Sequence, residues 1–307
     1  MKILITGGTG FIGSHLAKYL TPNNDVTICD NNFRGKYDEF LSNVKYIECD
    51  LTKEDEYEKL ETYDLIYHFA GINGTKNFYK IPYKVLETNT LININFINWC
   101  KKTSVKKVLF TSSSEVYAST PDKKIPTNED VILSVENIFN PRWSYAGSKI
   151  MGELLFANSG INYCIVRPHN IYGPRMGYDH VIPEVIARVF SRESPFKIYG
   201  SDQTRSFCYI DDAVVMLENI MNSSLTDKKI INLGVNNEIL IKELVYKIFD
   251  ILKYDCEILP IKSKEGSVSR RCPNTDLLSS ITNMENLTSI ETGLKYTCEW
   301  YQKNALL

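Results

Sequence analysis

Short runs of β-branched and aromatic residues alternate with amphipathic stretches along the first half of the chain. The runs predict strands at Lys2–Thr6, Asp25–Cys29, Lys45–Glu48, Leu65–Phe69, Lys107–Thr111 and Tyr163–Arg167. The amphipathic stretches predict helices at Gly13–Leu20, Ile81–Lys101 and Ser144–Asn158. Strands and helices that alternate in this way form a parallel sheet with helices on both faces, so the expected fold class is α/β and doubly wound.

The pattern changes after Arg167, where prolines and glycines interrupt the chain. The segment 205–212 predicts a strand that leads into a helix, and residues from about 231 predict a small C-terminal portion ending in a helix around Trp300. We therefore expect one domain from residues 1–167 together with about 205–230. Residues about 168–204 and 231–307 are expected to form a second, smaller domain.

Composition limits the partners. The chain has 307 residues, of which 43% are hydrophobic, and its net charge is −2, so neither nucleic acid nor a charged membrane surface is expected. No apolar run approaches the ~20 residues of a membrane span, and the N-terminal residues do not resemble a signal peptide. The eight cysteines include no Cys-x-x-Cys pair, so we expect free thiols, no metal site and a cytoplasmic location.

The long predicted helix is apolar on two faces. Leu91, Ile94 and Ile97 form one stripe, and Ile92, Phe96 and Trp99 form another. A helix of this kind is either deeply buried or part of an interface between subunits. Both interpretations stay open, and the second predicts a homodimer.

A glycine-rich turn follows the first predicted strand and opens the first helix. Gly7, Gly10 and Gly13 form a Gly-x-x-Gly-x-x-Gly pattern that also contains Phe11 and Ile12. Glycines at these positions allow a tight turn, close approach of the backbone to a pyrophosphate and close packing of the helix. The helix N-terminus then faces the phosphates. The pattern predicts a dinucleotide site in a Rossmann-type domain.

An acidic residue ends the second predicted strand. Asp30 can accept hydrogen bonds from the adenosine ribose hydroxyls, and its charge repels a 2′-phosphate, which favours NAD over NADP. Arg34 lies nearby and argues for NADP unless it is a solvated loop charge.

Tyr145 and Lys149 are four residues apart on a predicted helix, so their side chains share a face. An ammonium near a phenol favours the phenolate and is expected to lower the phenol pKa from about 10. Such a phenol can take a proton from an alcohol near neutral pH. With the dinucleotide loop, this pair predicts hydride transfer between an alcohol and a nicotinamide.

These motifs together resemble the extended short-chain dehydrogenase/reductase family, and within it the nucleotide-sugar epimerases, dehydratases and decarboxylases. The resemblance covers nearly the whole chain. Besides the glycine loop and the Tyr145/Lys149 pair, its motifs are Cys49-Asp50-Leu51, His68-Phe69-Ala70-Gly71, Thr111-Ser112-Ser113-Ser114-Glu115-Val116-Tyr117, the segment from Arg167 to Pro174, and the closing Gly293-Leu294 with Trp300-Tyr301.

The resemblance implies a role for each matching residue. On the cofactor side, Asp50 and Leu51 would lie by the adenine, Ala70 and Gly71 near the phosphates, and Asn89 on the long helix, with Lys149 bonded to the nicotinamide ribose. At the sugar, Ser113 would bind the reacting hydroxyl and Tyr145 would act as the base. Asn170, Arg205 and Arg271 would hold the substrate diphosphate, in keeping with the fit of an arginine fork to phosphate. His68 is expected to pack beneath the loop, and Arg270 to matter less than Arg271.

The reaction beyond oxidation at C4 depends on positions 114 and 115. The resemblance implies that 4-epimerases carry small or hydroxyl residues there and that 4,6-dehydratases carry an Asp–Glu pair. This chain has Ser114 at the substrate and Glu115 as a candidate base. We expect an NAD-dependent nucleotide-sugar 4-dehydrogenase or epimerase of surface polysaccharide biosynthesis. The alternatives are a 4,6-dehydratase or UDP-glucuronate-type decarboxylase that uses Glu115, and a non-catalytic dinucleotide-binding sensor or scaffold.

Overall fold

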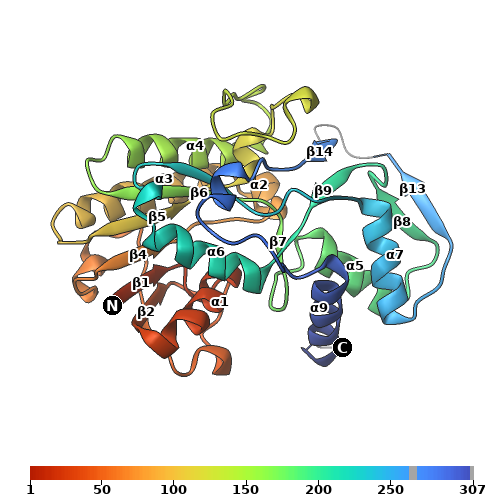
Figure 1. Ribbon diagram of the computed structural model, residues 1–307, viewed down its shortest axis with the longest axis horizontal. Helices are drawn as coiled ribbons and strands as arrows, with labels where there is room; N and C mark the ends of the chain where they lie inside the picture. Colours follow the sequence, from red (N-terminus) through yellow and green to blue (C-terminus); the bar gives the residue numbers. More distant parts are fainter. Residues whose placement is uncertain (263–267, 305–307) are drawn as a thin grey trace. The chain divides into compact units, whose positions relative to one another are not determined.

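The computed structural model describes residues 1–262 and 268–304 (Figure 1). The chain forms two compact units. The first comprises residues 1–119, 132–168 and 214–231, and the second comprises residues 120–131, 169–213 and 232–307. The sequence assigned residues 1–167 and about 205–230 to the first domain, whereas residues 120–131 and those from about 205 to Ala213 cluster with the second unit.

A seven-stranded sheet forms the centre of the first unit, in the order β11-β6-β5-β4-β1-β2-β3. Its strands are β1 (Lys2–Thr6), β2 (Asp25–Asp30), β3 (Lys45–Glu48), β4 (Leu65–His68), β5 (Lys107–Thr111), β6 (Tyr163–Pro168) and β11 (Ile230–Leu233). Neighbouring strands run parallel, which brings their carboxyl ends to one edge. The chain order reverses between β1 and β4, the kind of position where ligands of such sheets bind.

Helices cover both faces of this sheet (Figure 1). On one face, α3 (Pro82–Cys100) and α4 (Trp143–Ala157) bury Phe96 and Phe156 against Val108 and Phe110. On the other lie α1 (Phe11–Leu20) and the part of α6 (Ile210–Asn222) that belongs to this unit, joined by a 2.8 Å hydrogen bond from Tyr19 to Glu218. The doubly wound α/β class predicted from the alternating pattern is therefore confirmed.

The second unit combines small sheets with helices. Its sheets are β12-β9-β14, β13-β8 and β10-β7. The strands are β7 (Ile171–Tyr172), β8 (Phe196–Tyr199), β9 (Thr204–Ser206), β10 (Cys208–Tyr209), β12 (Glu238–Leu240), β13 (Ile258–Ile261) and β14 (Arg270–Arg271). The helices are α5 (Val181–Phe190), α7 (Ile241–Leu252), α8 (Asp276–Ser279) and α9 (Ile290–Asn304).

One helix of the first unit was missed by the sequence patterns. The short helix α2 (Thr75–Lys80) begins after Gly74, whose φ of 109° only glycine adopts readily. It ends at Lys80 with Ile81 as its C-cap residue, and Pro82 then starts α3, because proline fits the first turn of a helix. No helix among the described residues is long and apolar enough to cross a membrane.

Candidate active site

The glycine loop between β1 and α1 is closely packed. Gly7 has a φ of +68°, and a Cβ atom there would lie 2.8 Å from the backbone nitrogen of Ala70. A Cβ atom on Gly13 would lie 2.4 Å from the carbonyl oxygen of Gly7. The amide of Gly10 donates to that same oxygen at 3.1 Å. The loop therefore requires glycine for its backbone conformation and for its contacts.

The first turn of α1 presents its backbone amides at this loop. Phe11 and Ile12 begin the helix, and Gly10 is its N-cap residue. Within the part of the chain that the structure describes, no side chain caps this N-terminus. Amide groups and the positive end of the helix dipole suit an anion such as a pyrophosphate.

Two acidic residues lie at the carboxyl ends of the neighbouring strands β2 and β3: Asp30 is the last residue of β2, and Asp50 follows β3. Asp30 accepts hydrogen bonds from the backbone amides of Thr9 at 3.1 Å and Asn32 at 2.9 Å. Asp50 accepts from the amide and hydroxyl of Thr52, and Leu51 beside it is buried. The turn containing Asp30 is thus tied directly to the glycine loop.

Asn89 on α3 supports the loop that contains Ala70 and Gly71. Its side chain accepts from the amide of Ile72 at 2.7 Å and donates to the carbonyl of Ile72 at 3.1 Å. It also donates to the hydroxyl of Ser148 on α4 at 3.0 Å. The structure therefore shows Asn89 buried and bonded to protein groups, so that it joins the loop after β4 to the helix that carries Tyr145.

The residues present fit a bound dinucleotide. Glycines form a tight cradle, the N-terminus of α1 opens onto it, and Asp30 stands at the end of the next strand. Each is a feature that dinucleotide-binding folds use for the pyrophosphate and the adenosine ribose.

Tyr145 and Lys149 lie on the buried face of α4. The ring of Tyr145 stacks on Phe78 of α2, with centroids 4.6 Å apart. The ammonium of Lys149 donates to the carbonyl oxygen of Thr111 at 2.7 Å and lies 5.7 Å from the centre of the Tyr145 ring. Burial lowers the pKa of Lys149 to about 8, while Glu153 opposes this shift.

The expectation that the Tyr145 pKa lies below its ordinary value is wrong for this structure. Burial raises the pKa of Tyr145 well above its usual value, because removing a phenolate from water is costly. A hydrogen bond with Ser113 and the charge of Arg34 oppose the increase, while the charge of Glu115 adds to it. Lys149 instead directs its ammonium to the end of β5.

The loop after β5 places two polar side chains near the first turn of α4. Ser113 caps the short helix η4 (Ser114–Tyr117) and accepts a hydrogen bond from the amide of Glu115 at 3.2 Å. Glu115 forms an ion pair with Arg142, and their Nη2 and Oε2 atoms are 2.8 Å apart. Ser114 is buried between them in the chain. Arg142 was not recognised from the sequence, although its position three residues before Tyr145 was a usable signal.

A buried polar network below this loop was also missed. Glu153 accepts two hydrogen bonds from Arg167, at 2.9 and 2.6 Å, and another from Ser112 at 2.5 Å. Arg167 donates in addition to the hydroxyl of Tyr117 at 2.6 Å. The usable signal was the position of Glu153 four residues after Lys149, on the same helix face.

His68 is a buried packing residue, as expected from the sequence. It is fully buried, contacts the Thr6 hydroxyl at 2.7 Å and stacks on Phe96 at 3.9 Å. Burial lowers its pKa to about 3, so the ring is neutral at physiological pH.

The second unit holds the three residues expected at the substrate diphosphate. Arg205 on β9 and Arg271 on β14 are register partners in a parallel pair, so they project to the same side of that sheet. Asn170 has a φ of 40° and donates to the carbonyl of Ser206 at 2.9 Å. Arg270 is instead paired with Glu238 at 2.7 Å, in line with its smaller expected role.

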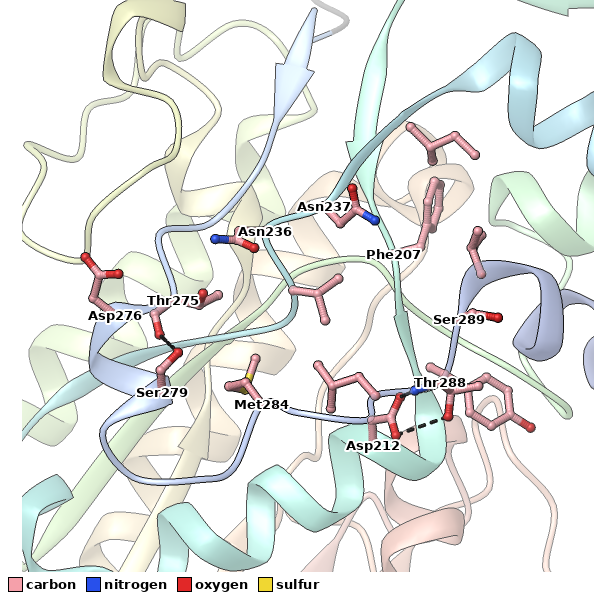
Figure 2. A pocket seen from close by; sticks show the side chains of 15 residues that line it. Phe207, Asp212, Asn236, Asn237, Thr275, Asp276, Ser279, Met284, Thr288 and Ser289 are labelled. Atoms are coloured by element: carbon pink, nitrogen blue, oxygen red, sulfur yellow. Dashed lines mark hydrogen bonds between the residues drawn. The ribbon is translucent and has the colours of Figure 1, made fainter.

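A separate pocket of about 410 Å³ lies within the second unit (Figure 2). Phe207, Asn237 and Met284 line it, and Asp212 accepts hydrogen bonds there from the amide and hydroxyl of Thr288. Its lining, over the described chain, does not include Asn170, Arg205 or Arg271. It is therefore distinct from the residues that the sequence motifs predicted.

Comparison with known proteins identifies the family. The sequence model described as the NAD dependent epimerase/dehydratase family matches residues 3–234. The chain is 33% identical to the UDP-N-acetyl-alpha-D-glucosaminuronate decarboxylase of Bacillus cytotoxicus, covering 98% of both chains. It is 32% identical to UDP-glucuronic acid decarboxylase 6 of Arabidopsis thaliana, covering 96% of this chain and 87% of that one.

The fold is similar to solved structures as well. The UDP-N-acetylglucosamine 4-epimerase of Methanobrevibacter ruminantium superimposes with a TM-score of 0.87, at 28% identity and 98% coverage of both chains. The resemblance inferred from the sequence motifs is thereby confirmed. The chain belongs to the NAD dependent epimerase/dehydratase family, which places it among the enzymes of the extended short-chain dehydrogenase/reductase type.

Proposed function

We propose that this protein oxidises the C4 hydroxyl of a nucleotide-diphosphate sugar, with NAD as the hydride acceptor. The observation that carries the proposal is the convergence of Ser113, Tyr145 and Lys149 at the carboxyl end of β5 and the first turns of α4. NAD, when bound, supplies the site for a hydride taken from C4. The protein residues then have to orient the hydroxyl and remove its proton.

Tyr145 is the proposed base, and Ser113 is the proposed hydrogen-bond partner of the sugar oxygen. Since burial raises the Tyr145 pKa, the site must stabilise the phenolate with nearby positive charge. Lys149, whose pKa is about 8, carries such a charge at neutral pH and lies one turn along the helix. Its bond to Thr111 holds it at the end of β5.

We assign NAD rather than NADP on the basis of Asp30. Its carboxylate is fixed by two backbone amides at the end of β2. A fixed negative charge there accepts hydrogen bonds from ribose hydroxyls and repels a 2′-phosphate. Arg205 and Arg271 are proposed to bind the substrate diphosphate, because paired guanidinium groups match phosphate oxygens.

A second candidate adds decarboxylation after oxidation at C4. It is favoured by two relatives, at 33% and 32% identity, whose names are those of uronate decarboxylases. In this reaction the bond between C5 and C6 breaks, and its electron pair moves toward the C4 carbonyl to form an enolate. Carbon dioxide leaves, and C5 then takes a proton. Glu115 is the titratable side chain next to Ser113 and Ser114 that could serve this carbon.

The test is incubation of the purified protein with UDP-, GDP-, dTDP- and CDP-sugars, followed by mass spectrometry and proton-exchange analysis at C5. A substrate should yield a 4-keto sugar or a product derived from it, and Tyr145→Phe should lower the rate by about 100- to 10,000-fold. Full activity of Tyr145→Phe would contradict the proposal. Glu115→Gln separates the two candidates. A decarboxylase or dehydratase loses turnover but still forms the 4-keto species, and a C4 dehydrogenase keeps most of its rate.

We also propose a homodimer. The α3 and α4 helices leave large apolar side chains exposed, namely Leu86, Leu91, Ile94, Met151 and Leu154. On the long helix, Leu91 and Ile94 of the first predicted stripe are exposed, whereas Ile97 of that stripe is buried together with Ile92 and Phe96 of the second. Adjacent exposed apolar positions on two packed helices favour association with a second copy.

A further inference from the structure

Arg142 and Glu115 lie beside the two residues proposed to act at C4. Ser113 and Glu115 belong to the loop after β5, while Arg142 is the N-cap residue of α4 and Tyr145 lies in its first turn. Arg142 has helical backbone angles of −53° and −35°, so it lies on the same side of that turn as Tyr145, three residues later. Two pairs therefore connect the same two elements: Ser113 with Tyr145, and Glu115 with Arg142.

The first pair is assigned to the C4 oxygen, so the second pair lies near the neighbouring part of the sugar. In a pyranose the substituents on C3 and C5 flank the C4 oxygen, and Arg142 lies less than one helical turn from Tyr145. The Glu115 charge also raises the pKa of the Tyr145 phenol, in keeping with a position beside the reacting group. Of the substituents on C3 and C5, only the one on C5 is a carboxylate in a uronic acid, and a carboxylate is the partner that a guanidinium binds most strongly.

A guanidinium at this position discriminates strongly between possible C5 substituents. It has five N–H donors in a planar fork, so it can serve a protein carboxylate and a second anion together. A hydroxymethyl group gains little from such a charge, whereas a carboxylate gains charge-assisted hydrogen bonds. Without the guanidinium, a substrate carboxylate beside Glu115 would place two negative charges together.

We propose that Arg142 is a specificity-determining residue that binds a carboxylate on C5 of the sugar, so that the substrate is a nucleotide-diphosphate uronic acid. This inference rests on the proposed oxidation at C4 and adds the class of sugar. The side chains of Arg142 and Glu115 are 20% and 21% exposed, so the pair is partly desolvated and still reachable by a ligand. Glu115 then holds Arg142 in position at 2.8 Å.

The test measures binding rather than turnover. Tyr145→Phe serves as the background, with NAD present, so that bound sugars are not consumed. Dissociation constants are measured by calorimetry for three matched acid and neutral pairs: UDP-glucuronate and UDP-glucose, UDP-N-acetylglucosaminuronate and UDP-N-acetylglucosamine, and GDP-mannuronate and GDP-mannose. We expect the acid of one pair to bind more tightly than its neutral partner. Arg142→Gln should shift the acid-to-neutral ratio of dissociation constants by about 10- to 100-fold toward the neutral sugar.

Three further variants make the result decisive. Arg142→Lys keeps the charge without the fork and should retain part of the preference. Arg188→Gln is a matched control, because Arg188 also pairs with a glutamate at 2.8 Å and is also 20% exposed. Arg188→Gln should leave the acid-to-neutral ratio of dissociation constants within about threefold of the wild-type ratio, since surface pairs contribute little. In a Glu115→Gln background, Arg142→Gln should still shift the ratio if Arg142 contacts the ligand itself.

The outcomes separate this inference from the function on which it rests. If no nucleotide sugar binds and the wild-type protein oxidises none, the proposed function is wrong. If sugars bind and are oxidised but Arg142→Gln leaves the ratio unchanged, Arg142 does not recognise a carboxylate. If its effect disappears in the Glu115→Gln background, Arg142 acts only by positioning Glu115, which also overturns the inference.

Discussion

Glu153 and Arg167 form a buried, doubly hydrogen-bonded ion pair beneath the loop that carries Ser113 and Glu115. The two bonds measure 2.9 and 2.6 Å, and the side chains are 8% and 2% exposed. The pair joins α4 to β6, and its bonds to Ser112 and Tyr117 extend it to both ends of the loop. It therefore fixes the loop relative to the helix that carries Tyr145 and Lys149.

Replacing Glu153 by glutamine should affect both stability and pH dependence. It leaves the Arg167 charge buried without its counter-charge, which costs about 3–5 kcal/mol of unfolding free energy. It also removes a negative charge that raises the Lys149 pKa, so that pKa should fall below about 8. If turnover needs the charged ammonium, kcat should decline at a lower pH than in the wild type. Denaturant unfolding and a pH profile of kcat measure the two effects.

Glu193→Gln is the matched control for this prediction. Glu193 also makes two hydrogen bonds with an arginine, Arg188, both at 2.8 Å, but its side chain is 33% exposed. A partly exposed pair of the same geometry near the surface is expected to contribute about 0–1 kcal/mol. Equal destabilisation by the two variants would show that burial of the Glu153 pair is not what makes it important.

Lys149 should make stability depend on pH in the alkaline range. Its pKa is about 8 in the folded protein, below the ordinary value of 10.5, so the unfolded chain binds the proton more tightly. Stability therefore rises with pH between these two values, by up to about 3 kcal/mol, and is lowest where the buried group is charged. The difference in unfolding free energy between wild type and Lys149→Met should increase in the wild type's favour over this range. A difference that stays constant with pH would contradict the lowered pKa.

The sequence could predict elements whose signals are local. The glycine loop and Asp30 were found because a tight turn, a helix N-terminus and a strand end each need particular residues nearby in the chain. His68 was expected to pack beneath the loop, and it is buried at the end of β4. Periodicity also gave α3 and α4 to within one or two residues.

Features that depend on three-dimensional packing could not be predicted from the sequence. The Tyr145 pKa was expected to fall, but the spacing of Tyr145 and Lys149 contains no information on the desolvation that raises it. Arg142 is 27 residues from its partner Glu115, and Arg167 is 14 from Glu153, so no helical or strand period connects either pair. Asn89 shows the same limit, because its bonds to Ile72 and Ser148 join three separate elements.

Alanine at Gly13 should disrupt the dinucleotide loop. The new Cβ atom would lie 2.4 Å from the carbonyl oxygen of Gly7, and neither backbone segment can move freely. We expect a loss of about 1–3 kcal/mol of stability and weaker NAD binding, measured by thermal unfolding and by titration. Gly147→Ala is the control, since a Cβ atom there meets nothing within 4 Å. Alanine in the α4 helix should instead stabilise it by about 0.5–1 kcal/mol. If Gly13→Ala bound NAD as tightly as the wild type, the close contact between Gly13 and Gly7 would not be required for the cofactor site.

The proposed dimer gives a prediction about the outer surfaces of α3 and α4. Leu154 on α4 is 54% exposed, and Leu91 and Ile94 lie exposed on the neighbouring α3. Leu154→Glu places a charge in the proposed interface, so light scattering should show a shift from dimer to monomer. Leu225→Glu is the control, because Leu225 is 65% exposed but belongs to the short helix η6 (Ser224–Thr226) rather than to α3 or α4. Since the substitution leaves the buried face of α4 intact, Leu154→Glu should keep the fold. A wild-type protein that is monomeric at all concentrations would show that these apolar side chains serve another purpose.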